Sequence, residues 1–266
     1  MDPLRRRRYL DALGIEPWRL RGAAQPVDAA LEPPEPAAPP APAAKPEPMP
    51  PKSTPTKPAA PALPLPIEPG FEVPTDWDGL RAAVADCQRC KLCSTRTHTV
   101  FGVGDPAAPL MVVGEGPGAD EDAQGEPFVG RAGKLLDEML KAIGRSRQAA
   151  ETDGSVFIAN VVKCRPPGNR DPQPDEVEAC RPYLDQQIKL VRPRLIVALG
   201  RVAAQRLLDT DAPLSKLRGP LYHYGETQTP VFVTYHPAYL LRSPGEKAKS
   251  WQDLKRVHQL LRELAV

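Results

Sequence analysis

Leu110-Met111-Val112-Val113-Gly114-Glu115-Gly116-Pro117-Gly118, at positions 110–118, joins a short apolar run to a glycine-rich turn. Similar runs bounded by turn residues recur at Val156 to Ala159, Leu195 to Leu199, and Val231 to Val233. Continuous apolar runs of this length are typical of strands covered on both faces. Segments with helical spacing lie between and around them: Leu80 to Ala85, Gly133 to Ile143, Asp175 to Val191, Val202 to Leu208, and Trp251 to Leu264. The alternation predicts an α/β fold around a parallel sheet, with functional loops at the carboxyl ends of the strands.

The turn after the first strand has the glycines of a ligand-binding loop but not the charge of a nucleotide site. Gly116 and Gly118 resemble the start of a dinucleotide loop, and the third glycine of that fingerprint is missing. The acidic run Asp120 to Asp122 would repel a pyrophosphate, which disfavours a nucleotide cofactor. Phe128 follows between Pro127 and Val129, and by itself it is compatible with a plain core residue.

Two polar side chains follow later strands. Asn160 closes the second strand, where its amide can donate and accept toward a ligand or simply cap the strand end. His236 follows the last strand and is fixed by Pro237, a placement that suits a hydrogen-bond donor or an acid/base group. A lone histidine is usually incidental. Several polar features at one edge of one sheet favour a functional site there.

Two further segments have cations that phosphate would attract. Arg218 lies in Lys216-Leu217-Arg218-Gly219, which is compatible with a phosphate contact or with a solvated loop. Leu240 and Leu241 precede Arg242, which combines an apolar wedge with a cation. We therefore expect Arg218, Leu240, Leu241 and Arg242 to lie against a phosphate-containing ligand.

Four of the five cysteines form two groups, Cys87-x2-Cys90 and Cys164-x15-Cys180, and Cys93 repeats the first step. A close Cys-x2-Cys pair aims both sulfurs at one ion or cluster, whereas a disulfide within it would be strained. Ferredoxin-type runs use this spacing for iron-sulfur ligation, whereas zinc ribbons repeat Cys-x2-Cys in both halves. An iron-sulfur centre is favoured over zinc, and the alternative for the second group is two small buried hydrophobes.

Composition limits the class of protein. The chain has 266 residues with 35 Lys and Arg against 33 Asp and Glu. It has no apolar run that could span a bilayer, and its start lacks the apolar stretch of a secretory signal. We therefore expect a soluble, cytoplasmic protein with no membrane partner, whose reduced thiols are available for metal.

Proline divides the chain into three parts. Between residues 26 and 70 lie 17 of its 35 prolines, mixed mainly with Ala, Glu and Lys, so we expect a disordered linker there. Residues 1–25 form a short basic and apolar segment that is too short to fold alone, so it either docks on a DNA backbone or a protein partner or is a frayed, solvated tail. Residues 71–266 are long enough for one folded domain, which we expect to be a monomer.

Four motifs together resemble the family 4 uracil-DNA glycosylases, the iron-sulfur type related to a phage DNA polymerase. They occur in family order from about Asp86 to the C-terminus, and they are Gly114-Glu115-Gly116-Pro117-Gly118, Pro127-Phe128-Val129-Gly130, Asn160 with Lys163-Cys164-Arg165-Pro166-Pro167, and His236-Pro237-Ala238-Tyr239-Leu240-Leu241. The resemblance implies a three-layer α/β/α domain with a four-stranded parallel sheet. It also implies hydrolysis of the N-glycosidic bond of deoxyuridine flipped out of single- or double-stranded DNA, the first step of base excision repair.

The resemblance also assigns roles to residues. Phe128 would stack on uracil, Asn160 would read its edge, and Gly116 would assist with backbone groups. His236 would stabilise charge on uracil O2, and Glu115 would position water or stabilise the sugar cation. Glu121 would crowd the part of the pocket where a thymine methyl would lie. Leu240, Leu241 and Arg242 would fill or brace the gap that the flipped nucleotide leaves in DNA. The ligands of a 4Fe-4S cluster would be Cys87, Cys90, Cys164 and Cys180. Cys93 is not needed by the family pattern.

Two alternatives stay open at this level. A non-catalytic iron-sulfur module for DNA binding or electron transfer would use the same cysteines, but it does not explain Phe128, Asn160 and His236 together. A glycosylase with broader targets, such as hypoxanthine or xanthine, would share the architecture.

Overall fold

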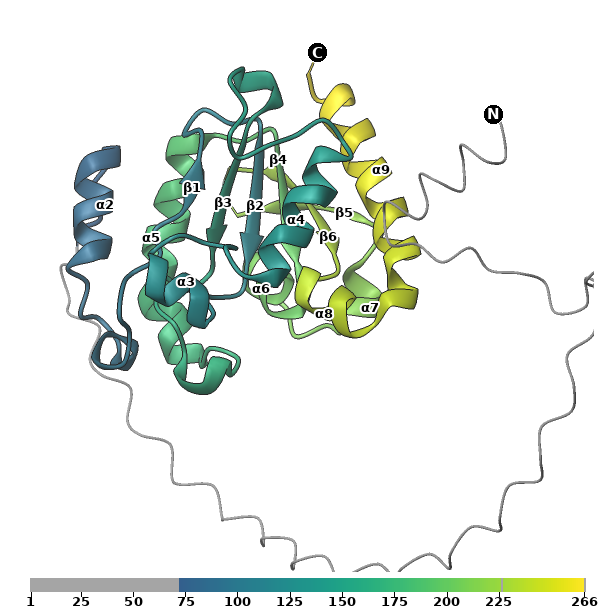
Figure 1. The fold of residues 1–266 in the computed structure, drawn as a ribbon. Helices are drawn as coiled ribbons and strands as arrows, with labels where there is room; N and C mark the ends of the chain where they lie inside the picture. Colours follow the sequence, from purple (N-terminus) through teal and green to yellow (C-terminus); the bar gives the residue numbers. More distant parts are fainter. Residues whose placement is uncertain (1–71, 226, 266) are drawn as a thin grey trace, which may run out of the picture. The chain divides into compact units, whose positions relative to one another are not determined.

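Six strands form one sheet whose centre is parallel. The computed structural model describes residues 72–225 and 227–265, so the predicted segments 1–25 and 26–70 lie outside the described residues. The strand order is β1-β3-β2-β4-β6-β5 (Figure 1). The strands are β1 Val103–Gly104, β2 Leu110–Gly114, β3 Val156–Asn160, β4 Leu195–Leu199, β5 Leu221–Tyr224 and β6 Thr229–Thr234. The pairs β3/β2, β2/β4 and β4/β6 are parallel, which confirms the predicted four-stranded parallel centre.

The two edge strands were not predicted. β1 pairs antiparallel with β3, and β5 pairs antiparallel with β6. β1 has only two residues, and β5 is Leu-Tyr-His-Tyr with alternating exposed and half-buried side chains. Neither has the continuous apolar run that marked the buried strands, because an edge strand is covered less completely than a central one.

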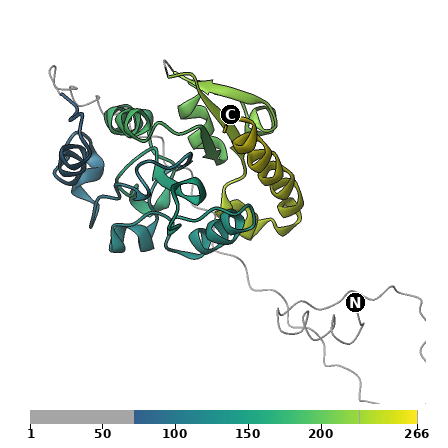
Figure 2. The ribbon, with the colours of Figure 1, turned by 90° about the horizontal axis from the view of Figure 1, so that it is seen from above.

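Helices cover both faces of the sheet (Figures 1 and 2). They are α2 Trp77–Ala85, α3 Ala119–Gln124, α4 Arg131–Lys141, α5 Pro174–Val191, α6 Gly200–Leu207, α7 Leu214–Leu217, α8 Pro237–Arg242 and α9 Lys247–Glu263. Short 3-10 turns occur at Lys91–Ser94, Thr152–Gly154, Pro167–Asn169 and Pro244–Glu246. No helix within the described ranges is long and apolar enough to cross a membrane.

Two separate apolar cores hold the layers together. On β2, Met111 and Val113 face one core, whereas Leu110 and Val112 face the other, as the two-residue period of a strand requires. The first core receives side chains from α2, α5, α6 and α7, and the second from α4, α8 and α9. This confirms the three-layer α/β/α arrangement.

The carboxyl ends of the parallel strands meet at one edge of the sheet. Gly114 at the end of β2 lies opposite Asn160 at the end of β3. Leu199 at the end of β4 lies opposite Thr234 at the end of β6. Residues after these four strands are therefore brought together although they are up to about 120 positions apart in the sequence.

Candidate active site and cysteine pocket

A cavity of about 410 Å³ opens at the carboxyl ends of the parallel strands. Its size falls within the range of small-molecule sites. Seven residues predicted from the sequence line it: Glu115, Gly116, Glu121, Phe128, Asn160, His236 and Arg242. Other lining residues include Pro117, Gly118, Ala132, Pro166, Asn169, Arg170, Asp171 and Ala238. The structure thus brings together most of the predicted site.

Gly114 allows the central side chains of this pocket to approach the backbone. A Cβ at this position would lie 2.5 Å from Oδ1 of Asn160 and 2.7 Å from Cζ of Phe128. Both distances are shorter than van der Waals contact. The glycine at the end of β2 therefore makes room for an amide and an aromatic ring that converge from two other segments.

Asn160 presents a buried amide at the end of β3. The residue is 2% exposed. Its Oδ1 has no hydrogen-bond partner among the described residues. A buried acceptor left unpaired costs roughly 1–3 kcal/mol, so the protein gains from a ligand that donates to it.

His236 is held as a neutral imidazole in one tautomer. The backbone N–H of Ala238 donates to Nδ1 at 3.1 Å, which leaves the ring proton on Nε2. Burial lowers the pKa of His236 to about 4, with the charge of Arg242 acting in the same direction and that of Glu121 opposing it. The imidazole at neutral pH is therefore an uncharged Nε2–H donor.

Phe128 packs beside this imidazole in an unusual backbone conformation. The ring centroids of Phe128 and His236 are 5.6 Å apart, with a 31° angle between the rings. Phe128 has φ of 56°, which is strained for a residue with a side chain. Arg147 binds the Pro127 and Phe128 carbonyl oxygens at 2.7 and 3.2 Å. Gly133 leaves room for the Phe128 carbonyl, which would lie 1.7 Å from a Cβ there.

Glu121 ties the two loops of the pocket to each other. Its Oε1 accepts hydrogen bonds from the backbone N–H groups of Val129 and Gly130, both at 3.0 Å. Its Oε2 accepts from the N–H of Gly118 at 3.0 Å. Because both carboxylate oxygens hold backbone, Glu121 fixes the position of Phe128 relative to the glycine-rich turn as well as lining the cavity.

Glu115 shares the cavity with a second carboxylate, Asp171, which the sequence did not reveal. Burial and, after it, the neighbouring Asp171 together raise the pKa of Glu115 to about 7, while Arg201 opposes the shift. Asp171 is in turn ion-paired with Arg201. An acidic residue in a loop is indistinguishable by sequence from a solvated one, so only the fold places Asp171 beside Glu115.

The prediction that Leu240 enters DNA is wrong for this structure. Leu240 is 1% exposed and packs in the second core, because α8 turns it toward the sheet. The exposed side chain at this place is Tyr239, at 37%. Its ring lies 5.1 Å from that of Tyr235. Leu241 is half-buried and Arg242 is exposed, and both belong to the same short helix, α8.

Arg218 does not line the cavity, and its guanidinium is already engaged. Nε and Nη2 donate to the Asp253 carboxylate at 3.0 and 3.1 Å, and Nη1 donates to the Tyr235 hydroxyl at 3.1 Å. The guanidinium also lies over the Tyr235 ring, 4.2 Å from its centroid. These contacts correct the expectation of a free phosphate-binding cation. Arg218 instead packs on the Tyr235 ring, which in turn contacts the Tyr239 ring.

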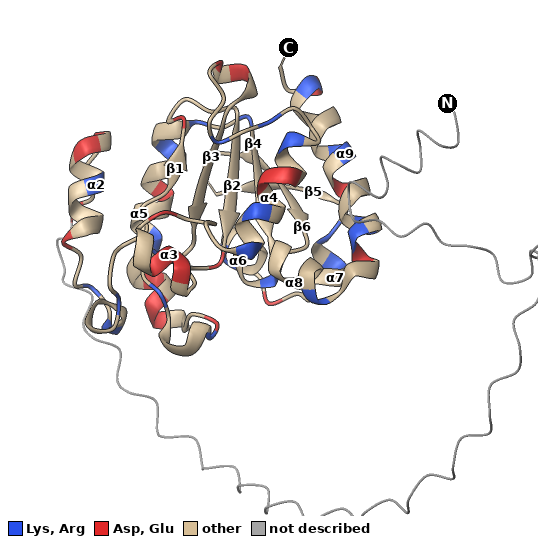
Figure 3. Ribbon diagram, in the orientation of Figure 1, with Lys and Arg blue, Asp and Glu red and all other residues tan. Residues whose placement is uncertain are grey.

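Charges are unevenly distributed at this edge of the sheet (Figure 3). The first turn of α3 is acidic, with Asp120, Glu121 and Asp122. Cations occupy the start of α6, α7 and the end of α8, as Arg201, Lys216 and Arg242. A polyanion would be attracted to the α6–α8 side and repelled by α3.

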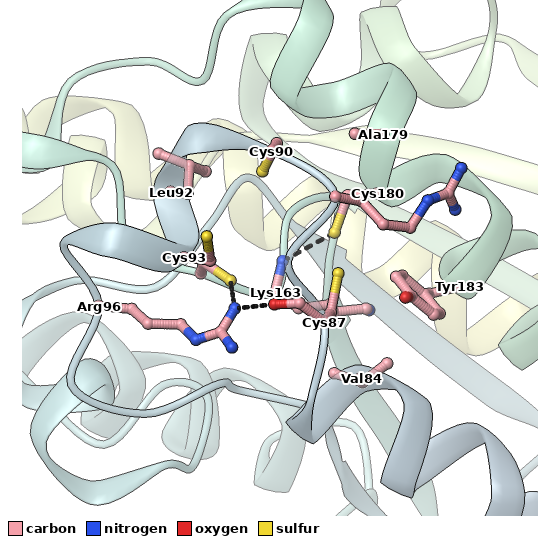
Figure 4. A pocket seen from close by; sticks show the side chains of 12 residues that line it. Val84, Cys87, Cys90, Leu92, Cys93, Arg96, Lys163, Ala179, Cys180 and Tyr183 are labelled. Carbon is pink, nitrogen blue, oxygen red and sulfur yellow. Dashed lines mark hydrogen bonds between the residues drawn. The ribbon is translucent and has the colours of Figure 1, made fainter. Parts of the chain in front are cut away.

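All five cysteines line a second, small pocket between α2, α5 and the loop after β3. Figure 4 shows Cys87, Cys90, Cys93 and Cys180 around it. Arg96 donates to Sγ of Cys164 at 3.1 Å, and the backbone N–H of Lys163 donates to Sγ of Cys180 at 3.2 Å. None of the cysteines in the described part of the chain is in a disulfide.

This pocket has the donor set of a thiolate-bound centre. Burial raises the pKa of Cys90 to about 11 and that of Cys180 to about 12, the latter opposed by Lys163. Buried thiolates at neutral pH therefore require a bound cation. Within residues 72–225 and 227–265, no three or more His, Cys, Asp or Glu side chains are placed so that they could hold a single metal ion.

Comparisons with known proteins agree with this geometry. The family described as the uracil DNA glycosylase superfamily matches residues 101–255. A type-4 uracil-DNA glycosylase of Sulfurisphaera tokodaii is 45% identical over 68% of this chain and 83% of its own length. Similar enzymes of Archaeoglobus fulgidus and Thermotoga maritima are 44% and 40% identical, over 69% and 68% of this chain and 92% of each relative. The chain thus belongs to the uracil-DNA glycosylase superfamily and, within it, to the type-4 uracil-DNA glycosylases.

Proposed function

We propose that this chain flips deoxyuridine out of DNA and hydrolyses its N-glycosidic bond, which starts base excision repair. The unpaired Oδ1 of Asn160 in a pocket of about 410 Å³ is the observation that carries this proposal. Uracil has an N3–H that can donate to Oδ1, and an O4 that can accept from the Asn160 amide N–H. Cytosine presents the reverse pattern, an N3 acceptor and an N4 donor, so it would pair with neither amide group in the orientation that suits uracil.

His236 would stabilise the leaving base. As the bond between N1 and C1′ breaks, its electron pair moves into the uracil ring and negative charge develops on O2. An Nε2–H donor whose ring is already fixed by the Ala238 N–H stabilises that charge without having to reorient. Phe128, whose ring lies beside the imidazole, would form the wall on which the flipped base stacks.

Glu115 would act on the sugar and the water. Its ionised carboxylate stabilises the oxocarbenium-like sugar and accepts a proton as the water oxygen bonds to C1′. The products are an abasic sugar and uracil. Asp171 would raise the basicity of Glu115, because two neighbouring carboxylates resist being charged together.

A pH profile tests the role of Glu115. With a pKa of about 7, Glu115 is protonated below neutrality and ionised above it. We expect kcat/KM for uracil release to rise about tenfold per pH unit below about pH 7 and to level above it. Glu115→Gln should lower the plateau and abolish the slope. Stability has the opposite trend: the native state retains this proton up to about pH 7, so the Glu115 contribution to the free energy of unfolding falls between about pH 4.5 and 7. An unchanged slope in Glu115→Gln would assign the titration to another group.

Tyr239, Leu241 and Arg242 would contact the DNA around the flipped nucleotide. Tyr239 is the exposed aromatic of this surface, and the Tyr235–Arg218 stack supports it from below. We expect Tyr239→Ala to slow uracil release from duplex DNA by roughly 10- to 100-fold, which is the effect of losing one stacking contact. The rate on single-stranded substrates should stay nearly unchanged. Trp251→Ala is the matched control, because Trp251 is also exposed but belongs to α9 and not to the Tyr235–Tyr239 stack. Equal losses on both substrates would contradict a role in filling the duplex.

The cysteine pocket would hold a 4Fe-4S cluster on Cys87, Cys90, Cys164 and Cys180. When bound, the cluster would supply a structural cross-link between the segment that follows α2, the loop after β3, and α5. It would take no part in breaking the glycosidic bond. Cys93 lines the same pocket and is left as a spare thiol. Purified protein should contain about four iron and four sulfide per chain, whereas zinc alone would contradict the assignment.

Incubation of the protein with a uracil-containing oligonucleotide, without added cofactor and followed by alkali, tests the function itself. Strand scission at uracil supports the enzyme, and a mobility shift alone would support a non-catalytic DNA-binding module instead. Hypoxanthine and xanthine oligonucleotides tested in parallel define the range of bases. We further propose that the protein acts as a monomer in the cytoplasm and that residues 1–25 bind a repair or replication protein.

A further inference from the structure

Lys163 buries its ammonium group between the two pockets. The residue is 1% exposed. Nζ donates to the backbone oxygen of Asn160 at 2.8 Å and to Oε1 of Gln187 at 2.6 Å. Both acceptors are neutral, and within residues 72–225 and 227–265 no carboxylate pairs with this ammonium. A buried cation with only neutral partners is unfavourable unless negative charge lies nearby.

The cysteine pocket would supply that negative charge when it holds a thiolate-bound centre. The backbone N–H of Lys163 donates to Sγ of Cys180 at 3.2 Å (Figure 4). Cys164, the residue after Lys163, lines the same pocket. Cysteines bind metal as thiolates, and four thiolates around an iron-sulfur cluster leave the whole group anionic. Lys163 lines the same pocket as the five cysteines, so its buried charge would oppose that of an anionic cluster held there.

The other end of Lys163 holds the residue that would read the base. Asn160 is the last residue of β3, and its carbonyl oxygen receives the ammonium rather than a neighbouring strand. Gln187, which is fully buried in α5, cannot turn away, because its Nε2 donates to the Phe101 carbonyl oxygen at 2.9 Å. Lys163 therefore fixes the Asn160 peptide through a chain of hydrogen bonds that extends to α5 and to the segment before β1.

We propose that Lys163 is a positioning residue that couples the cysteine pocket to uracil recognition. Its ammonium holds the Asn160 peptide in place, and the anionic thiolate centre balances the ammonium. The proposal rests on the proposed function, since it needs Asn160 to read uracil. The cysteine centre then contributes to recognition through charge and position, without taking part in the reaction.

The test is a double-mutant cycle between Lys163→Met and Asn160→Ala, measured as single-turnover uracil release. Methionine is unbranched and only one heavy atom shorter than lysine, and it removes the charge. We expect Lys163→Met to slow release by about 10- to 100-fold in the wild-type background and to have almost no further effect when Asn160 is already alanine. An equal loss in both backgrounds would overturn the proposal, because a general loss of structure does not depend on the Asn160 amide.

A second measurement does not depend on activity. Iron in Lys163→Met should be lost to a chelator several-fold faster than in the wild type, because the thiolate centre loses its buried counter-charge. Ile188→Ala is the control, since Ile188 is buried beside Gln187 and has no polar contact. Equal iron loss in the two variants would overturn the charge-balancing role. Wild-type protein that releases no uracil would instead refute the proposed function, and the iron measurement would still test the link to the cysteines.

Discussion

Asn160→Ala is expected to lower uracil release by roughly 100- to 1,000-fold without destabilising the fold. The amide has no hydrogen bond to another described residue, so its removal breaks no internal hydrogen bond. The change in the free energy of unfolding should stay within about 1 kcal/mol. The loss of rate follows because the flipped base would lose both edge contacts that hold it in the reactive position.

Single-turnover excision and thermal unfolding measured on the same preparation separate these two effects. Binding of free uracil should weaken in parallel with the rate. Val161→Ala is a suitable control, because Val161 is the next residue, equally buried and apolar. If Asn160→Ala released uracil at the wild-type rate, the base would be read elsewhere and the cavity would not be the active site.

His236→Ala is expected to reduce kcat by roughly 100- to 1,000-fold with little change in KM. The Nε2–H donor matters most after charge has begun to develop on uracil O2, so its loss raises the barrier more than it weakens substrate binding. His236→Gln should recover part of the rate, because its amide N–H can donate in the same direction.

The pH dependence gives this prediction a second readout. The pKa of His236 lies near 4, so the imidazole stays neutral across the range in which Glu115 titrates. The rise in activity toward about pH 7 should therefore persist in His236→Gln at a lower level. Loss of that rise in the histidine variant, with Glu115 intact, would mean that His236 itself titrates and acts as a charged group.

The central fold could be predicted because burial on both faces leaves a strong pattern. Each of the four parallel strands coincided with a continuous apolar run, and the strand over Leu195–Leu199 was predicted to the residue. β1 and β5 could not be predicted, because their pairing depends on β3 and β6 rather than on their own composition. α8 was not predicted either, and this is why Leu240 was assigned to the DNA surface: the helix decides that Leu240 faces the core and Tyr239 faces out.

The site was predictable where a residue lies at or near the end of a parallel strand. Asn160 is the last residue of β3 and His236 comes shortly after β6, and parallel strands bring those ends to one edge. Arg218 was not predictable, because its partner Asp253 is 35 positions away and belongs to α9. An arginine in a loop has the same sequence signature whether it is free or paired.

The sequence by itself determined the α/β class, the parallel centre of the sheet, the grouping of the cysteines and the residues at the strand ends, because these follow from local apolar runs and short spacings. Only the tertiary structure decided the proton position on His236, the pairing of Glu115 with Asp171 and the burial of Lys163 between Asn160 and Cys180. Each of these depends on how a backbone turn or a distant segment places one polar atom against another. Such contacts, which are set by packing across the sheet edge, leave no periodic pattern in the chain.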